Sequence, residues 1–379
     1  MSRDNSKIKQ ELSFVTITNL LEKGMTALFW FLLIPIVTKT EYGEISFLLS
    51  TAVFGFGLAS MGLRKLIIVF ESKNEPVFFP AFIFGLLTST VVGLGAYFYT
   101  QNHFVSVLIF CIMTFELTVS YFLSKDNYKN FSIFSILRRL LSLIISLILF
   151  QFMGVDGVII GFILSTVIGF YGFYILKNEI HNSFSVLKQK ATFLSQNYSI
   201  TLIDSFSTSG INIIIGSLFG FVILANYTVS FQFLLAINTI PSILSVYLLP
   251  KESRGVSNKK LKIYSIILSV IVAILSIVLI PFLVPALIPE YSDIIFPLQI
   301  ISISIIPTIF STIIETSFLG SGNVKPVLIS NSSQFVTMLS LTILLGSTMG
   351  LLGIVIAWLF SQIVQVCIAG TFYKLSLSK

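Results

Sequence analysis

The chain has 379 residues, of which 55% are hydrophobic and only 10% are charged, and its mean hydropathy is +0.97. Soluble domains carry about a quarter charged residues, so this composition excludes a soluble protein. The formal net charge of +7 does not indicate nucleic-acid binding, because the basic residues are dispersed over many short loops.

Long apolar runs predict an all-α integral membrane protein, because a helix needs about 20 apolar residues to cross a bilayer. The runs do not alternate at period two, so we expect no β-barrel. The twelve predicted passes are residues 13–38, 42–67, 77–99, 103–124, 132–153, 155–176, 194–222, 224–250, 263–288, 294–319, 326–347 and 350–373. The polar segment before the first run lacks a small-residue cleavage site, so we expect no cleaved signal peptide.

The positive charges predict how the chain crosses the membrane. Of the 23 lysines and arginines, all but two fall on one side; Lys23 lies inside the first pass and Lys39 lies on the opposite side. Basic residues in short loops face the cytoplasm, so we expect a multi-pass protein of the cell membrane with both termini cytoplasmic. Cys111 and Cys367 fall inside passes, which implies no disulfide framework.

The passes divide into two halves that resemble each other. The longest connection, residues 177–193, separates a predicted N-terminal six-helix lobe (1–176) from a C-terminal one (194–379) and is expected to be cytoplasmic. The segment from Gly154 to Ser165 recurs at equal glycine and serine spacing from Gly350 to Ser361. Because each half has an even number of passes, the repeats are parallel, and a substrate is expected to bind between them.

Pass one carries a polar face at helical spacing, comprising Thr16, Asn19 and Lys23. Ionisable groups at membrane depth are costly, so they usually face a cavity or a partner. Lys23 is therefore either a cation in an aqueous cavity that awaits an anionic substrate, or one half of a structural ion pair, for instance with Asp204. We favour the cavity interpretation.

Pass five opens with a second polar stripe, formed by Ser132, Ser135, Arg139, Ser142 and Ser146. Arg138, beside it, and Arg64, at the end of pass two, are also compatible with ordinary anchoring at the cytoplasmic headgroups. The planar guanidinium group binds two phosphate oxygens at once. We therefore expect Arg139 first, and Arg64 next, to line a cationic cavity.

Three carboxylates fall within passes. Asp204 opens a polar stretch of pass seven that ends at Asn212, and this stretch either lines water or packs closely against a neighbouring helix. Asp204 is equally compatible with binding a proton or sodium ion and with neutralising Lys23. Glu116 and Glu315 are more typical of hydrogen bonds between helices than of proton carriers, although both roles stay open.

The sequence contains no enzyme signature. It has no glycine-rich phosphate loop, and its two histidines, His103 and His181, lie on opposite sides of the predicted membrane. We therefore expect a non-enzyme with no metal site and no cofactor, apart from coupling to sodium ions or protons.

A family resemblance rests on short motifs. A turn ending in Tyr42-Gly43 opens pass two, and Gly62-Leu63-Arg64 closes it. Together with the glycine-rich openings of passes six and twelve and the segment 214–220, this resembles the Wzx-type polysaccharide flippases of the multidrug/oligosaccharidyl-lipid/polysaccharide exporter superfamily. The chain departs from many relatives just before Gly216, where it has Asn212 and Ile213 instead of an acidic–basic pair.

The resemblance implies a V-shaped bundle of two lobes that works by alternating access. Such a protein moves a polyprenyl-pyrophosphate-linked oligosaccharide, of the kind used for O-antigen or capsule, from the inner to the outer leaflet. Lys23, Arg139 and Arg64 would hold the pyrophosphate, with Asn19, Thr16 and Asn212 as polar cavity residues. The implied partners are the lipid-linked glycan, the bilayer and polysaccharide-assembly proteins.

Other functions are less well supported by the sequence. A drug/cation antiporter of the same superfamily would favour acidic cavity residues, so Lys23 and the arginines argue against it, whereas Glu116, Asp204 and Glu315 argue for it. A membrane polymerase or ligase needs a large external loop, which the predicted topology lacks. The loop between passes two and three lacks the Gly/Asp/Arg pattern of major-facilitator transporters, which argues against that class. A non-transporting scaffold would not explain the polar stripes at membrane depth.

Overall fold

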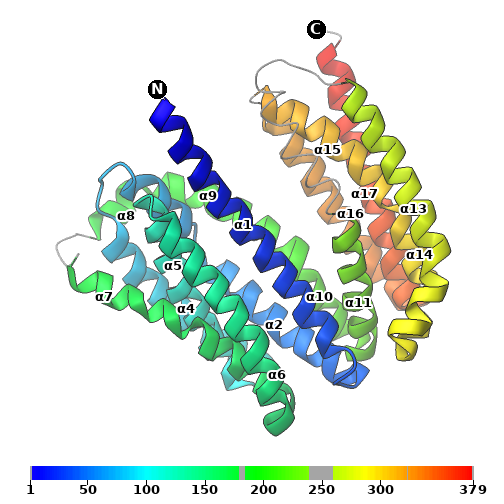
Figure 1. Ribbon diagram of the computed structural model, residues 1–379, viewed down its shortest axis with the longest axis horizontal. Coiled ribbons are helices and arrows are strands. Elements are labelled where there is room, and N and C mark those ends of the chain that lie inside the picture. The colour runs from blue at the N-terminus through cyan, green and yellow to red at the C-terminus, as the bar shows by residue number, and fades with distance from the viewer. Residues whose placement is uncertain (1, 179–183, 239–258, 322, 378–379) are drawn as a thin grey trace. The chain divides into compact units, whose positions relative to one another are not determined.

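The computed structural model describes residues 2–178, 184–238, 259–321 and 323–377, and its side chains from Ile17 onward, except those of 178, 259, 376 and 377. These residues form helices joined by short connections (Figure 1). The chain divides into two compact units, Met1–Ile214 and Ile215–Lys379. The side chain of Thr16, residue His181 and the second half of predicted pass eight lie outside the described residues.

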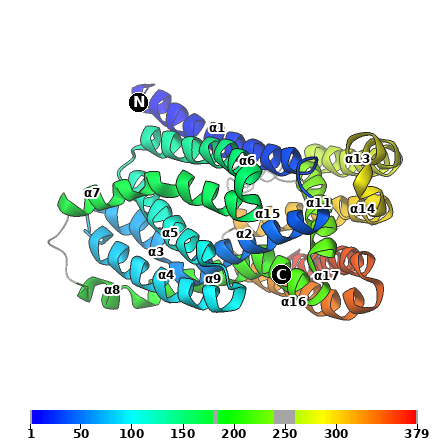
Figure 2. The ribbon, with the colours of Figure 1, turned by 90° about the horizontal axis from the view of Figure 1, so that it is seen from below.

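The helices of the first unit follow one another with few residues between them. They are α1 (Ser2–Leu33), α2 (Lys39–Ser60), α3 (Leu63–Leu66), the π-helical turn η1 (Ile67–Glu71), α4 (Phe78–Thr100), α5 (His103–Ser124), α6 (Tyr128–Thr166), η2 (Val167–Phe170), α7 (Tyr171–Asn178), α8 (Ser185–Gln189), α9 (Ala191–Ser205), the π-helical turn η3 (Phe206–Gly210) and the start of α10 (Ile211–Phe219). Within this unit α1 lies alongside α6, as Figure 2 shows.

The second unit is built in the same way. It contains the end of α10, then α11 (Phe221–Ile237), α13 (Lys259–Leu287), η4 (Pro289–Ile294), α14 (Ile295–Ile303), α15 (Ile305–Gly320), α16 (Lys325–Met349) and α17 (Leu351–Leu377). Although α9 and η3 follow the predicted loop 177–193, they pack against α2 and so group with the preceding helices. The predicted six-helix lobes therefore stay a prediction.

Nine helical segments of the described residues are long and apolar enough to cross a membrane. They are residues 39–60, 78–100, 103–124, 128–177, 191–219, 260–287, 289–320, 325–349 and 351–375. The segment 128–177 contains two predicted passes, and α11 is a shorter apolar helix at the position of pass eight. Membrane-spanning helices are thus present as expected, whereas the number twelve is not established by this measure.

The two predicted passes within residues 128–177 form a hairpin that turns at Gly154. The backbone there has φ 59° and ψ −137°, a conformation that side chains disfavour. A Cβ on Gly157 would overlap the Leu149 carbonyl, and Ser146 donates a hydrogen bond to the Val158 carbonyl oxygen at 3.1 Å. The helical segments before and after the turn therefore pack closely against each other.

The internal repeat seen in the sequence has the same backbone conformation in both halves. Gly350, the counterpart of Gly154, has φ 57° and ψ −133°, and a Cβ on Gly353 would overlap the Leu345 carbonyl. The repeated spacing thus encodes a second hairpin, between α16 and α17. Small residues at such contacts let helix backbones approach closely, which membrane proteins use in place of a hydrophobic driving force.

Helix α2 is shorter than the predicted pass two. A capping box fixes its start, because Glu41 accepts the backbone N–H of Thr38 at 2.8 Å while the Thr38 hydroxyl accepts the N–H of Glu41. The helix ends at Ser60, where Met61 and Gly62 have positive φ, and α3 then continues in a new direction. The predicted pass over 42–67 therefore contains a break, which lies at the Gly62-Leu63-Arg64 motif.

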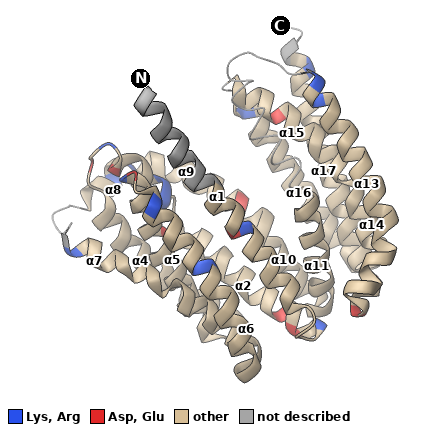
Figure 3. Ribbon diagram, in the orientation of Figure 1, with Lys and Arg blue, Asp and Glu red and all other residues tan. Residues whose placement is uncertain are grey.

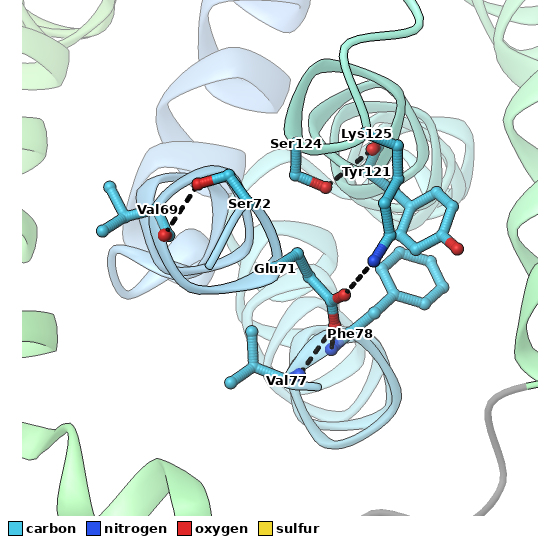
Figure 4. A network of polar contacts seen from close by, with 8 residues as sticks. All are labelled: Val69, Glu71, Ser72, Val77, Phe78, Tyr121, Ser124 and Lys125. Atoms are coloured by element: carbon cyan, nitrogen blue, oxygen red, sulfur yellow. Dashed lines mark hydrogen bonds and ion pairs between the residues drawn. The ribbon is translucent and has the colours of Figure 1, made fainter. Parts of the chain in front are cut away.

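A buried carboxylate ties three helices together at the end of the first unit. Glu71 is only 1% exposed, and one of its oxygens accepts the backbone N–H groups of Val77 and Phe78, both at 2.7 Å. Its other oxygen accepts the Lys125 ammonium at 2.9 Å (Figure 4). Glu71 thereby caps the N-terminus of α4 and holds it to the ends of η1 and α5.

Replacing Gly157 or Gly353 by alanine is expected to destabilise the protein by about 1–3 kcal/mol, because the added methyl group overlaps a carbonyl of the facing helix. Gly95→Ala is the matched control, since a Cβ there meets nothing within 4 Å. Thermal unfolding of purified protein in detergent measures the difference. Equal midpoints for all three variants would contradict the hairpin packing.

Glu71→Ala should lower the stability by roughly 1.5–3 kcal/mol, because it removes hydrogen bonds between a charged acceptor and buried donors. Glu71→Gln keeps an acceptor for the N–H groups of α4, so we expect a smaller loss. Glu75→Ala is a suitable control, since Glu75 pairs with Lys190 but is 44% exposed. The account fails if Glu71→Ala and Glu75→Ala unfold at the same temperature.

Candidate functional site

The first unit contains a cavity of about 390 Å³. Its wall is formed by residues of α1, α2, α3, α5, α6 and η3, all of them within Met1–Ile214. One part of the wall is aromatic: Phe29 packs edge-on against Phe162, with ring centroids 5.3 Å apart, and Trp30 lies beside them. The other part is charged, which is the property that distinguishes this cavity.

Three arginines line the cavity: Arg64 from α3, and Arg138 and Arg139 from α6. Arg64 forms an ion pair of 3.1 Å with Glu116 of α5, which also lines the cavity. Arg138 pairs with Glu22 of α1 at 3.5 Å, and its guanidinium carbon lies 4.4 Å from the centroid of the Phe115 ring. The helices of this unit are therefore joined by charge pairs at the cavity wall.

Arg139 is the third arginine of the cavity wall, and it takes part in neither of these ion pairs. Among the described residues, no carboxylate lies within 4.0 Å of its guanidinium group, and its buried Nε has no hydrogen-bond partner. The Ser142 and Thr166 hydroxyls are also on the cavity wall. A cavity with three arginines and one carboxylate on its wall favours an anion. The planar guanidinium groups can each bind two oxygens of a phosphate group.

The sequence-predicted basic residues separate into two groups. Arg139 and Arg64 both line the cavity, and their role in binding substrate stays a prediction. Lys23 and Asn19 are exposed on α1 and are not part of the cavity wall. The described residues contain no ion pair between Lys23 and Asp204. The role assigned to Lys23 stays a prediction.

The predicted acidic and polar residues are dispersed. Glu116 is at the cavity, Asp204 is exposed on α9, and Asn212 donates a hydrogen bond of 2.9 Å to Ser50, a residue of the cavity wall. Glu315 belongs to the second unit, where it accepts a hydrogen bond of 2.8 Å from Gln365. Glu116 is thus paired with Arg64 of another helix and Glu315 with an amide, while their roles in ion coupling stay predictions.

Two features of the site were not identified from the sequence. Arg138 was regarded together with Arg139 as an anchor or a cavity residue, and the structure brings both to the cavity. Glu22 was not assigned a role, yet it pairs with Arg138. Two consecutive arginines inside an apolar run were the available signal, because ionisable groups at membrane depth usually face a cavity or a partner and adjacent residues on a helix point in different directions.

Comparisons with solved structures identify the fold. The chain resembles the lipid II flippase MurJ in an inward closed conformation, with a TM-score of 0.73, 14% identity, and coverage of 96% of this chain and 87% of that one. It also resembles an inward-facing multidrug resistance MATE family transporter of the MOP superfamily, with a TM-score of 0.69, 14% identity, and coverage of 96% and 94%.

A third similar structure is a MOP superfamily transporter from Pyrococcus furiosus, described as having a binding pocket of reverse polarity; its TM-score is 0.51 at 14% identity, with coverage of 97% and 93%. No family model matches the chain, and no curated protein matches it. At this identity the likeness establishes a shared fold. Together with the apolar helices, it makes the chain a multi-pass membrane protein with the fold of MOP superfamily transporters.

The charge of the cavity predicts its binding preference. Arg139→Gln should weaken the binding of inorganic diphosphate about tenfold or more, because it removes a charge-assisted contact. Glu116→Gln should strengthen binding, since it releases Arg64 from its ion pair. Isothermal titration calorimetry on purified protein measures both changes.

The exposed Lys260 of α13 offers a matched control for these variants. Lys260→Gln removes the same charge as Arg139→Gln at a position outside the cavity, so diphosphate should bind as it does to the parent protein. Equal weakening by Lys260→Gln and Arg139→Gln would mean that only the net charge matters, and not the cavity.

Proposed function

We propose that this protein translocates a polyprenyl-pyrophosphate-linked oligosaccharide, such as an O-antigen or capsule repeat unit, across the cytoplasmic membrane by alternating access. The observation that carries the proposal is the cavity of the first unit, with three arginines and a single carboxylate on its wall. A diphosphate that links a lipid to a sugar carries two negative charges at neutral pH. Arg139, which lacks a carboxylate partner among the described residues, is its first contact.

Arg64 and Arg138 contribute to substrate binding by exchanging their carboxylate partners for oxygens of the diphosphate. Arg64 is paired with Glu116 and Arg138 with Glu22. Oxygens of the diphosphate would take the place of these carboxylates, so the cationic groups stay compensated before and after binding. The aromatic wall around Trp30 and Phe162 provides apolar surface for a sugar ring or the first isoprene unit.

The proposal includes a topology and a coupling scheme. Twelve passes form two lobes, 1–176 and 194–379, joined by the cytoplasmic segment 177–193, with both termini in the cytoplasm. Lys23, on the exposed face of α1, contacts the substrate outside the cavity described above. Movement is coupled to a sodium ion or a proton through Glu116, Asp204 or Glu315, and polysaccharide-assembly proteins are the expected partners.

An ion-coupled drug/cation antiporter is the alternative, and two observations favour it. One similar structure is a multidrug transporter, and the partner of Glu315 among the described residues is an amide, that of Gln365. A cationic drug would nevertheless meet three arginines in the cavity of the first unit. Electrostatic complementarity therefore supports an anionic substrate over a cationic one.

Lys23→Ala and Arg139→Ala should each impair the display of glycan at the cell surface without loss of protein. Surface glycan is measured by antibody or lectin labelling of intact cells, and protein abundance by immunoblot of the membrane fraction. Lys262→Ala, on α13 outside the cavity, is the control. Unchanged glycan display in both test variants would remove these residues from the mechanism.

A further inference from the structure

A second cavity lies at one end of the first unit, away from the arginines. Its volume is about 250 Å³, and it is formed by the end of α5, the start of α6 and helix α7. The residues of its wall that bear polar groups are Tyr121, Lys125, Asn127, Asn130, Tyr171 and Tyr174. The function proposed above makes no use of this cavity.

Lys125 provides a fixed positive charge at the cavity. Its ammonium group is 2.9 Å from Glu71 and 5.4 Å from the centroid of the Tyr121 ring (Figure 4). Glu71 shares its charge with two backbone N–H groups at the N-terminus of α4. The side chain of Lys125 stays 37% exposed, so a further donor of its ammonium group is available to a ligand.

Hydrogen-bonding groups accompany this charge. The Asn127 oxygen accepts the backbone N–H of Asn130 at 3.2 Å, which leaves the NH₂ group of Asn127 and the whole amide of Asn130 without a partner among the described residues. The same holds for the hydroxyl of Tyr174. The wall therefore offers several neutral donors next to one cation, which suits a phosphate ester with further oxygen atoms.

The cavity adjoins an exposed aromatic surface. Phe170, Phe173 and Tyr174 are 38%, 43% and 61% exposed, and they belong to a segment apolar enough to span a membrane. Tyrosine is typical of the membrane interface, where its ring is in an apolar layer and its hydroxyl reaches water. Acyl chains that pack along α7 would therefore bring their headgroup to the cavity.

The charges around the cavity favour an anionic headgroup. Lys129 lies in sequence between Asn127 and Asn130, Lys177 follows Tyr174 by one helical turn, and both are exposed. Lysines and arginines gather at this end of the unit, near α5, α7 and α8 (Figure 3). The neighbouring acids have partners of their own: Glu71 pairs with Lys125, Glu75 pairs with Lys190, and Asp126 accepts a hydrogen bond of 3.0 Å from the Tyr128 hydroxyl.

We infer that this cavity binds the phosphate headgroup of an anionic phospholipid whose acyl chains pack against the exposed aromatic face of α7. Lys125 contacts the phosphate, Asn127 and Asn130 contact the headgroup hydroxyls, and Tyr171 and Tyr174 flank the glycerol. The site is independent of the substrate taken by the arginine-lined cavity. It would favour phosphatidylglycerol over phosphatidylcholine, because the choline ammonium would meet Lys125, Lys129 and Lys177.

The test uses full-length protein purified in a neutral detergent. A thiol-reactive dye reports thermal unfolding through Cys111, which is buried in the folded protein, as a rise above the constant signal of the exposed Cys367. Dioleoyl-phosphatidylglycerol should raise the unfolding midpoint by roughly 2–4 °C at tenfold excess over its dissociation constant. Dioleoyl-phosphatidylcholine and inorganic phosphate should not. Equal effects of the two lipids, or an equal effect of phosphate alone, would overturn the inference.

Two variants locate the effect. Asn130→Leu and Tyr174→Ala should lose most of the stabilisation by phosphatidylglycerol, whereas Tyr264→Ala should keep it. Tyr264 is a matched control, because it is 66% exposed on α13, close to the 61% of Tyr174. Full stabilisation of both test variants would exclude this cavity.

A second measurement of lipid preference uses the parent protein, so it does not require that either variant folds. Native mass spectrometry of the parent protein in an equal mixture of the two lipids should show retained phosphatidylglycerol in excess of phosphatidylcholine. Equal retention would contradict the inference.

Discussion

Cationic side chains inside a membrane protein must be compensated, and this constraint organises the first unit. A guanidinium group at membrane depth is costly unless it meets a carboxylate, a ring or water. Arg64 and Arg138 meet Glu116 and Glu22 from neighbouring helices, so the ion pairs hold α3 to α5 and α6 to α1. Arg139 has no such partner among the described residues, and it gives the cavity its positive sign. The same pairs thus stabilise the unit and determine the charge of the ligand that it can accept.

Close contact between helices brings these charges to one place. The turns at Gly154 and Gly350 have the same backbone conformation, and glycines three residues later let the hairpin helices touch through their backbones. Polar groups at the helix ends fix where helices begin. The capping box of Thr38 and Glu41 starts α2, and Glu71 caps α4 and pairs with Lys125. Lys125 in turn borders the second cavity, so one buried carboxylate supports both the fold and the lipid site inferred there.

The sequence predicted the helical class and part of the site. Apolar runs and glycine spacing are local signals, which is why the hairpins at Gly154 and Gly350 and the cavity residue Arg139 could be found. The pairing of Glu22 with Arg138 could not be found in this way. It depends on which faces of α1 and α6 meet, and sequence spacing does not determine how each helix is rotated about its axis. The predicted pass two ran on to residue 67, beyond the end of α2 at Ser60, because apolar residues continue on both sides of the Gly62-Leu63-Arg64 motif. Lys23 and Asp204 are exposed, and their roles remain proposals.

Transport of a defined lipid by reconstituted protein tests the central claim most directly. Proteoliposomes would be loaded with a fluorescent polyprenyl-diphosphate oligosaccharide, or with the same lipid and sugar joined without the diphosphate, and transfer between leaflets would be followed by accessibility to a membrane-impermeant quencher. The arginine-lined cavity predicts rapid transfer of the diphosphate-linked compound only, and loss of that transfer in Arg139→Gln. Equal transfer of both compounds, or transfer that Arg139→Gln leaves unchanged, would contradict a function based on anion recognition.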